Sequence, residues 1–351
     1  MRDKNISLKA NTLHLPAEWA LQSGVQLTWP HAETDWARML KEVQECFLNI
    51  AREIAEREIL FIVTPEVDEV KKQISSTVNM SNVRFLECKT NDTWARDHGA
   101  ITLLDEENNA SLLDFKFNGW GLKFASDKDN LITRTAFESG FLHGQYINRL
   151  GFVLEGGSIE SDGMGTLLTT AECLLSPNRN GQMNKTEIEE YLCSAFHTSR
   201  VLWLNHGYLA GDDTDSHIDT LARLCSPDTI AYVQCTDQND EHYEALRLME
   251  DELKSFCTIN GNPYRLLALP MVDKIEEEGE RLPATYANFL IMNKVILYPT
   301  YNQPENDACA KSVLEEAFPN HEIIGIDCRA LIRQHGSLHC VTMQYPSGVL
   351  K

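Results

Sequence analysis

Four side chains that could do chemistry occur at near-regular intervals along this 351-residue chain. Asp97, Glu155, His217 and Cys340 follow one another in steps of 58, 62 and 123 residues, and the last step is close to twice the others. Such spacing predicts a repeated structural unit of about sixty residues, each copy delivering one reactive side chain to a common centre. With Asp219 as a third carboxylate, the set would form a nucleophilic site that binds a cation.

Cys340 needs a partner to become a good nucleophile, because the thiolate rather than the thiol attacks. A protonated histidine or a bound positive substrate can provide that help. We predict His217 as the partner, because an extended segment would point His217 and Asp219 to the same side of the chain. Glu155 is the candidate to hydrogen-bond the imidazole and keep it protonated, as the third member of a triad does.

Asp97 and Asp219 would repel each other across one site unless a cation lies between them. The planar fork of a guanidinium group matches two carboxylates with paired hydrogen bonds. The two aspartates therefore favour a small cationic guanidino compound as the partner of this site.

Each motif also has a purely structural explanation. Asp97 could form a buried pair with Arg96 that holds a turn, and Glu155 could begin a Gly-Gly turn that needs permissive backbone angles. His339 and Cys340 could together bind a metal, but the remaining histidines and cysteines lack the spacing of a zinc site, so no metal is predicted. Neither a P-loop nor a G-x-G-x-x-G between strand and helix is present, so no nucleotide cofactor is expected.

Composition argues against several classes of protein, among them nucleic-acid-binding and membrane proteins. A net charge of −21 argues against nucleic-acid binding and would favour the approach of small cations. Residues 1–20 contain no apolar signal segment, and no stretch approaches the length of a membrane span, so no membrane partner is expected. The ten cysteines are scattered and include no C-x-x-C pair, which indicates reduced thiols in a cytoplasmic protein.

The elements expected around these residues repeat in the order strand, loop, hairpin and helix, with no Pro-rich or Gly-rich linker between copies. This repeated order predicts one closed, pseudo-symmetric α/β domain over residues 1–351, with roughly five copies of the unit. Each copy should carry a polar residue at the tip that faces the common centre, and the fourth of these polar tips is expected near residues 270–283. The acidic run in that segment is interpreted as a solvated loop or a lid. Strands are predicted at 59–63, 83–88, 99–104, 111–117, 152–154, 165–170, 200–204, 229–234, 264–269, 287–292, 294–298, 321–326 and 338–344, and helices at 35–59, 65–74, 185–196, 241–256 and 308–317.

Taken in order, the motifs resemble the agmatine deiminase (agmatine iminohydrolase) family, relatives of the peptidylarginine deiminases among the guanidino-group-modifying enzymes. The similarity covers nearly all of the chain. It rests on Leu15-Pro16-Ala17-Glu18-Trp19, Thr28-Trp29-Pro30, Trp94-Ala95-Arg96-Asp97-His98-Gly99, Phe117-Asn118-Gly119-Trp120-Gly121, Glu155-Gly156-Gly157, residues 162–170 and 178–180, residues 212–219, Tyr286-Ala287-Asn288-Phe289 and His339-Cys340.

The resemblance implies a five-bladed, pseudo-symmetric α/β propeller of the pentein type with its active site on the central axis, and no cofactor. It also implies a hydrolase that converts agmatine and water to N-carbamoylputrescine and ammonia through a covalent thiouronium on the cysteine, in putrescine biosynthesis and polyamine metabolism. By the same resemblance Cys340 is the nucleophile, His217 the general acid and base, Glu155 its orienter, Asp97 with Asp219 the guanidinium clamp, and Trp94 with Trp120 the pocket walls.

The chain departs from the family pattern just before the nucleophile. The family usually shows G-G-G-N-I-H-C, whereas this chain has Gln334-His335-Gly336-Ser337-Leu338-His339-Cys340, and Ser216 stands where glycine is usual. These changes leave open a deiminase of peptidyl arginine or another guanidino compound, an amidinotransferase, and a catalytically idle binding protein for polyamine-like cations. A homo-oligomer is compatible with the sequence.

Overall fold

A recurring three-stranded sheet organises the computed structural model, which describes residues 13–351. In one copy, β4 (Ile101–Leu104) and β5 (Ala110–Lys116) are antiparallel, and β6 (Gln145–Val153) runs parallel to β5. The antiparallel pair needs only a short turn, whereas the parallel strand needs a long crossover, which here contains helices. The same order recurs in β7 (Ile159–Ser161), β8 (Thr166–Thr170) and β9 (Arg200–Leu204), in β10 (Ala222–Ser226), β11 (Thr229–Gln234) and β12 (Arg265–Pro270), and in β15 (Leu290–Met292), β16 (Val295–Thr300) and β17 (Glu322–Asp327).

A further sheet of this kind joins the two ends of the described chain. β18 (Thr342–Pro346) is antiparallel to β1 (Gln22–Thr28), and β2 (Ile59–Thr64) is parallel to β1. β3 (Val83–Glu87) adds a fourth strand beyond β2. The C-terminal strand thus provides the antiparallel partner that every other repeat takes from its own hairpin. Residues 13–351 therefore form a mixed α/β fold with five sheets of one recurring order.

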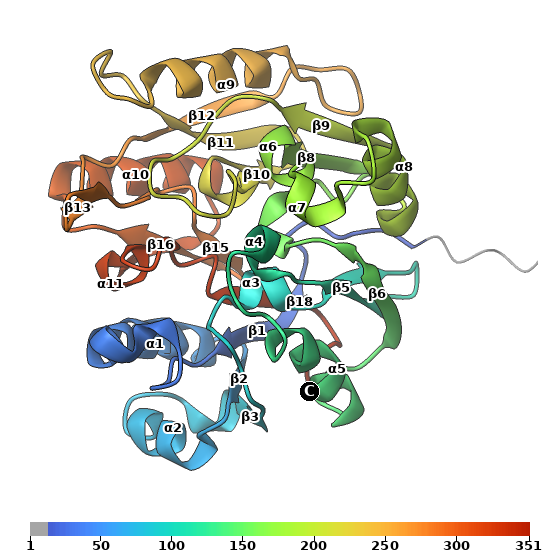
Figure 1. The fold of residues 1–351 in the computed structure, drawn as a ribbon, viewed down its shortest axis with the longest axis vertical. Helices are drawn as coiled ribbons and strands as arrows, with labels where there is room; N and C mark the ends of the chain where they lie inside the picture. Colours follow the sequence, from blue (N-terminus) through green and yellow to red (C-terminus); the bar gives the residue numbers. More distant parts are fainter. Residues whose placement is uncertain (1–12) are drawn as a thin grey trace, which may run out of the picture.

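The helices lie mostly in the crossovers. In α1 (Leu40–Ala55), Val43, Phe47, Ile50 and Ile54 are fully buried, so one face of the helix packs on the core. Figure 1 shows α1, α8, α9 and α10 at the periphery, while α3 and α4 lie near the middle of the view. The remaining α-helices are α2 (Val67–Ile74), α3 (Ala95–His98), α4 (Gly119–Leu122), α5 (Ile132–Glu138), α6 (Ala171–Leu174), α7 (Pro177–Asn180), α8 (Lys185–Phe196), α9 (Tyr243–Ser255), α10 (Pro304–Ala317) and α11 (Arg329–Ile332).

One local expectation was wrong and another was right in part. The segment after His217 is not extended but forms a single 3-10 turn, η5 (Ile218–Thr220). The acidic run near residue 278 is largely exposed, as expected of a solvated segment, but it forms a short hairpin in which β13 (Glu276–Glu277) pairs with β14 (Glu280–Arg281). The Arg281 side chain anchors this small hairpin to Asp240, 2.9 Å away.

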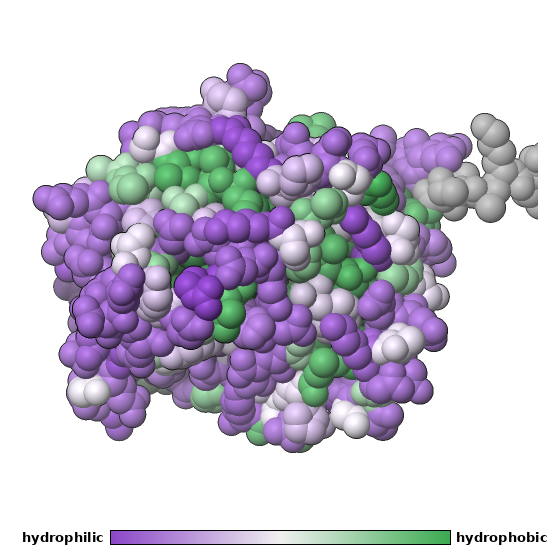
Figure 2. Space-filling model, turned by 90° about the horizontal axis from the view of Figure 1, so that it is seen from above, coloured by the Kyte–Doolittle hydropathy of each residue, from purple (hydrophilic) through white to green (hydrophobic). Residues whose placement is uncertain are grey.

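The molecular surface agrees with a composition in which 24% of residues are charged. The face shown in Figure 2 is mostly hydrophilic, and apolar side chains appear there in separate patches. No helix within residues 13–351 combines the length and the apolar character needed to cross a membrane.

Gly24 lies where β1 passes close to the backbone of β2. A Cβ atom at Gly24 would lie 2.1 Å from the backbone oxygen of Ile59, its partner across the parallel pair. We expect Gly24→Ala to lower the free energy of unfolding by about 2 kcal/mol, because the strand backbones must separate to relieve the clash. Urea unfolding measures the change. Gly151→Ala is the matched control, since a Cβ there meets nothing within 4 Å, and an equal loss in both variants would contradict the prediction.

Candidate active site

The candidate residues other than Trp120 all precede the first strand of a repeat, whereas Trp120 lies in α4, in the crossover between β5 and β6. Asp97 lies in α3 before β4, and Glu155 lies four positions before β7. His217 and Asp219 lie at η5 before β10, and Cys340 lies two positions before β18. Because the repeats share one strand order, equivalent positions at the start of each repeat meet at one place, as the distances below show.

The Cys340 thiol is buried and contacts two side chains. Its Sγ lies 3.3 Å from Asn288 Oδ1 and 3.9 Å from Asp219 Oδ2. Burial raises the pKa of the Cys340 thiol well above its ordinary value, and the carboxylates of Asp219 and Asp97 raise it further. In this structure the group is therefore a neutral thiol near neutral pH.

Asn288 was not among the predicted site residues. Its Oδ1 accepts hydrogen bonds from the backbone N–H groups of His339 (2.9 Å) and Cys340 (3.3 Å), so it fixes the backbone beside the thiol. Asn288 precedes β15 and so holds the place that the candidate residues hold in the other repeats. The prediction of this polar tip near residues 270–283 was wrong. A polar residue at the start of the hairpin predicted at 287–298 was the signal that would have located it.

Asp97 is buried and held by two donors. Trp120 Nε1 donates to Oδ2 at 2.9 Å, and the Gly157 backbone N–H donates to Oδ1 at 3.0 Å. Burial raises the pKa of the Asp97 carboxyl well above its ordinary value, and the neighbouring Asp219 raises it further. Trp120 adopts a left-handed backbone conformation (φ 53°), which is unusual for a large side chain. Its ring contacts that of Trp94 edge to face, with centroids 6.3 Å apart.

Asp219 hydrogen-bonds His339, a residue that the sequence suggested only as a metal ligand. His339 Nδ1 lies 2.8 Å from Asp219 Oδ2, whereas the buried Oδ1 atom has no hydrogen-bond partner. Burial alone would raise the pKa of Asp219, but the hydrogen bond and charge interaction with His339 outweigh it and hold the pKa below its ordinary value. The two aspartates thus have opposite pKa shifts.

The His217 imidazole is 1% exposed, and neither ring nitrogen has a hydrogen-bond partner. Burial lowers the pKa of His217 to about 3, so the ring is neutral near pH 7. A Cβ atom at Gly157 would lie 2.7 Å from His217 Nδ1, 2.9 Å from Asp97 Oδ1 and 3.1 Å from Asp219 Oδ2. The three side chains therefore converge over Gly157, where only glycine leaves room for them.

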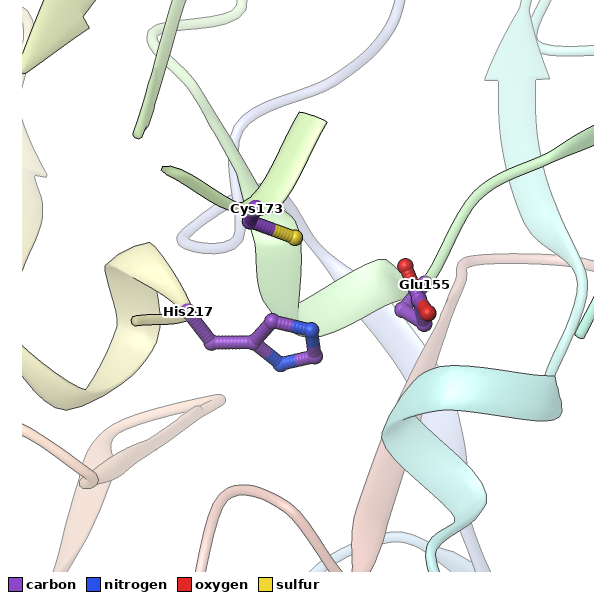
Figure 3. A group of neighbouring side chains, drawn as sticks. All are labelled: Glu155, Cys173 and His217. Carbon is purple, nitrogen blue, oxygen red and sulfur yellow. The ribbon is translucent and has the colours of Figure 1, made fainter. Parts of the chain in front are cut away.

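Glu155, Cys173 and His217 point toward a common space (Figure 3), and their potential ligand atoms lie within 4.8 Å of one another. Arg179 Nε, however, donates to both carboxylate oxygens of Glu155, at 2.9 and 3.0 Å. Burial raises the pKa of the Cys173 thiol well above its ordinary value, and metal ligation needs a deprotonated thiol. Arg179 thus occupies the Glu155 carboxylate and Cys173 keeps its proton, so these three side chains do not make a good metal site. Glu155 is better described as a carboxylate that Arg179 holds near the imidazole.

A pocket of about 380 Å³ opens over Cys340. Burial raises the pKa of Asp213 in its wall to about 6 and that of Asp92 to about 7. The described residues that line it include four aspartates but neither lysine nor arginine, which favours cationic ligands. These residues are Asp35, Asp92, Trp94, Asp97, Trp120, Phe124, Asp213, Thr214, Gln334, His335, Gly336 and Cys340.

The segment that departs from the family pattern forms one wall of this pocket. A Cβ atom at Gly336 would lie 2.2 Å from the Trp94 ring, so glycine is needed where the loop passes that ring. His335 takes a left-handed conformation (φ 64°), and its Nδ1 lies 2.7 Å from the carbonyl oxygen of Gly211. The Ser337 hydroxyl lies 2.8 Å from the Tyr301 hydroxyl. The substituted residues are thus accommodated by specific contacts beside the thiol.

Comparisons with known proteins give a consistent picture. The model of the Porphyromonas-type peptidyl-arginine deiminase family matches residues 14–346. A relative from Marinomonas sp. (strain MWYL1), named "Putative agmatine deiminase", is 32% identical, with 97% of this chain and 96% of that protein covered. The crystal structure of the "Putative Arginine Deiminase" from Porphyromonas gingivalis superposes with a TM-score of 0.91 at 51% identity, covering 97% of this chain and 100% of that one. The structure of a cysteine-to-serine variant of C. jejuni agmatine deiminase with substrate bound superposes with a TM-score of 0.90 at 37% identity. The match covers 99% of this chain and 100% of that one.

The raised pKa of Cys340 predicts how its reactivity responds to charge. We expect Asp219→Asn to accelerate alkylation of Cys340 by iodoacetamide at pH 8 by about 3- to 10-fold, because loss of the carboxylate lowers the thiol pKa and increases the thiolate fraction. Asp97→Asn should act in the same direction, and the exposed Asp228→Asn is the control. Peptide mass spectrometry measures the rate at Cys340. An unchanged or slower rate in both site variants would contradict the electrostatic explanation.

Proposed function

The chain belongs to the Porphyromonas-type peptidyl-arginine deiminase family, and we propose that it hydrolyses the guanidino group of agmatine. The resemblance inferred from the motifs is confirmed by these comparisons, and the chain is a hydrolase of C–N bonds. The proposed products are N-carbamoylputrescine and ammonia, a step of putrescine formation. The observation that carries the proposal is the convergence of a thiol, a neutral imidazole and two carboxylates without arginine partners at the base of a pocket that Cys340, Asp97 and three further aspartates line.

In the proposed site the substrate guanidinium lies between Asp97 and Asp219. The two carboxylates face one site, and only one of them has a lowered pKa, as expected for like charges close together. A bound guanidinium cation lets both ionise and donates a hydrogen bond to the unpartnered Asp219 Oδ1. The aromatic rings of Trp94 and Trp120 flank the same pocket and favour a cation at their faces.

The reaction then proceeds in balanced steps. His217 accepts the proton of the Cys340 thiol, and the thiolate attacks the central guanidino carbon to give a tetrahedral adduct. The protonated His217 gives its proton to one amino group, which leaves as ammonia, and an S-alkylthiouronium remains on Cys340. His217 next takes a proton from water as the oxygen adds to that carbon. The C–S bond breaks, the hydroxyl proton returns to sulfur, and the ureido product is released. His217 then loses its added proton to solvent, where ammonia takes up a proton to become ammonium, so the enzyme returns to its starting state.

The expectation of a hydrogen bond between Glu155 and the His217 imidazole was wrong, because Arg179 occupies both carboxylate oxygens and neither ring nitrogen has a partner. Glu155 therefore has an indirect role in this proposal. Its carboxylate is anchored by Arg179 and lies within 4.8 Å of a His217 ring nitrogen, and Figure 3 shows the two side chains pointing toward the same space. A negative charge there stabilises the imidazolium that forms during turnover, because opposite charges attract strongly in a buried site.

We also propose the finer fold assignment, a single catalytic domain shaped as a closed five-bladed α/β propeller. The recurring strand order of the five sheets supports it, as does the pairing of β18 with β1, which links the last repeat to the first. Positions at the start of successive repeats would then surround one axis, which accounts for the near-sixty-residue spacing of the candidate residues.

The pocket walls favour agmatine over free arginine. Agmatine ends in an ammonium group, whereas arginine adds a carboxylate that would meet Asp213 and find no lysine or arginine among the described lining residues. Lys123, near the mouth, is already bound to Asp215 and to the Asp213 carbonyl oxygen. A peptidyl arginine would have to place its backbone against the substituted loop at His335.

We expect Cys340→Ala to reduce ammonia release from agmatine to the background rate while agmatine still binds, because the clamp does not need the thiol. Ammonia release and isothermal calorimetry measure the two properties. The C. jejuni cysteine-to-serine variant with substrate bound supports this separation of binding from turnover. Cys193→Ala, on the outer helix α8, should keep wild-type activity. Turnover by Cys340→Ala would refute the mechanism.

Asp213→Asn tests the substrate. We expect the variant to raise the KM for agmatine about 10-fold with kcat little changed, because it removes a charge interaction made equally before and during the reaction. The preference for agmatine over free arginine should shrink in the same variant. Steady-state kinetics with agmatine, arginine and a capped arginyl peptide measure this, with Asp68→Asn on α2 as the control. Wild-type turnover of the peptide alone would move the substrate to peptidyl arginine.

A further inference from the structure

His339 lies between two carboxylates. Its Nδ1 lies 2.8 Å from Asp219 Oδ2, and its Nε2 lies 2.9 and 3.1 Å from the two carboxylate oxygens of Glu18. The same Nε2 lies 3.1 Å from Arg223 Nη2, which also pairs with Glu18. Burial and the charges of Arg223 and Arg96 lower the pKa of His339, against the opposing effect of the two carboxylates. The His339 side chain is 1% exposed, whereas the Glu18 side chain is 20% exposed. Glu18 and Asp219 come from opposite parts of the chain, and His339 joins them directly beside Cys340.

Glu18 is itself anchored. Its Oε1 accepts a hydrogen bond from Arg96 Nη1 at 3.0 Å, and its Oε2 forms an ion pair with Arg223. Although burial opposes ionisation, His339 and the two arginines hold the pKa of Glu18 well below its ordinary value. Arg223 in turn donates to the backbone oxygen of Phe289 at 2.6 Å. The outer end of the Glu18–His339–Asp219 series is therefore a fixed, charged group.

The orientation of the Asp219 carboxylate decides what it can bind. With Oδ2 held by His339, the second oxygen is left buried and without a partner. Without that contact the carboxylate could rotate about its side-chain bonds and turn toward the Cys340 thiol, since Oδ2 already lies 3.9 Å from Sγ. A hydrogen bond from one side is what keeps the other oxygen available.

We propose that Glu18 and His339 are positioning residues that hold Asp219 in the orientation that binds the guanidinium group. This inference rests on the proposed function, because it gives Asp219 the role of substrate clamp. His339 then has a role of its own besides its place next to the nucleophile. Through Glu18, the segment before β1 also contributes to the active site.

A second cavity gives direct access to this series. Glu18 lines a space of about 630 Å³, together with Leu15, Arg96 and Gln344. None of the described residues that line it also lines the pocket over Cys340. A small carboxylate can therefore reach the position of a deleted Glu18 side chain without entering the substrate pocket.

The test is chemical rescue of Glu18→Ala by formate. We expect kcat/KM for agmatine to fall about 10- to 100-fold, the range for loss of a hydrogen bond to a charged group. KM should rise more than kcat falls, because the clamp binds the guanidinium before and during the reaction. Formate should raise kcat/KM of the Glu18→Ala enzyme at least about 5-fold and leave that of the wild-type enzyme unchanged. Glu58→Ala removes another buried carboxylate, one that accepts from the Asn293 backbone N–H, and should show no rescue.

Substitution of His339 separates positioning from packing. An asparagine amide can take the place of the Nδ1 donor, whereas a glutamine amide takes that of Nε2, so His339→Asn should keep more activity than His339→Gln. Equal losses in the two variants, or a Glu18→Ala enzyme that is fully active or insensitive to formate, would overturn the inference.

The alkylation rate of Cys340 distinguishes failure of this inference from failure of the proposed function. Absence of ammonia release by wild-type enzyme from any guanidino compound would refute the proposed function alone. In that case a change in the alkylation rate in Glu18→Ala that formate reverses would still support the positioning of Asp219. An alkylation rate that neither Glu18→Ala nor formate changes would overturn it.

Discussion

Burying a carboxylate is unfavourable unless cations or hydrogen-bond donors satisfy it, and this constraint organises the centre of the molecule. Three buried or half-buried glutamates around the site meet it with buried arginines. These fixed pairs leave little freedom for the loops that carry them, so the starts of the repeats are held in register by charge as well as by strand pairing. The pairs are Glu155 with Arg179, Glu160 with Arg223, and Glu18 with both Arg96 and Arg223.

Asp97 and Asp219 have no arginine partner, and this difference marks the site. Each is buried, yet Asp97 is held only by neutral donors and Asp219 only by His339 on one oxygen. The three glutamates named above each have a guanidinium from the protein, whereas these two aspartates have none. A guanidinium from a substrate would complete the same type of interaction that stabilises the rest of the centre. The substrate class proposed above thus follows from how the protein satisfies its own buried charges.

Much of this arrangement could be predicted from the sequence, because reactive side chains at near-sixty-residue spacing indicate a repeat. Asn288 was missed because an amide carries no acid–base signal and because it departs from the spacing. The anchoring of Glu155 by Arg179 was missed because that contact depends on how two loops fold against each other. The pairing of β18 with β1 joins strands more than three hundred residues apart, and only tertiary packing selects it.

Activation of the thiol and selection of a cation have the same physical origin in the proposed reaction. Near neutral pH both Cys340 and His217 are uncharged, because burial raises the pKa of one and lowers that of the other. Moving the proton from sulfur to nitrogen creates two charges in a buried space that already holds carboxylates. A cation bound at those carboxylates offsets their repulsion of the thiolate, so the proton can move once a guanidinium is present. A neutral molecule of the same shape would occupy the pocket and leave the thiol protonated.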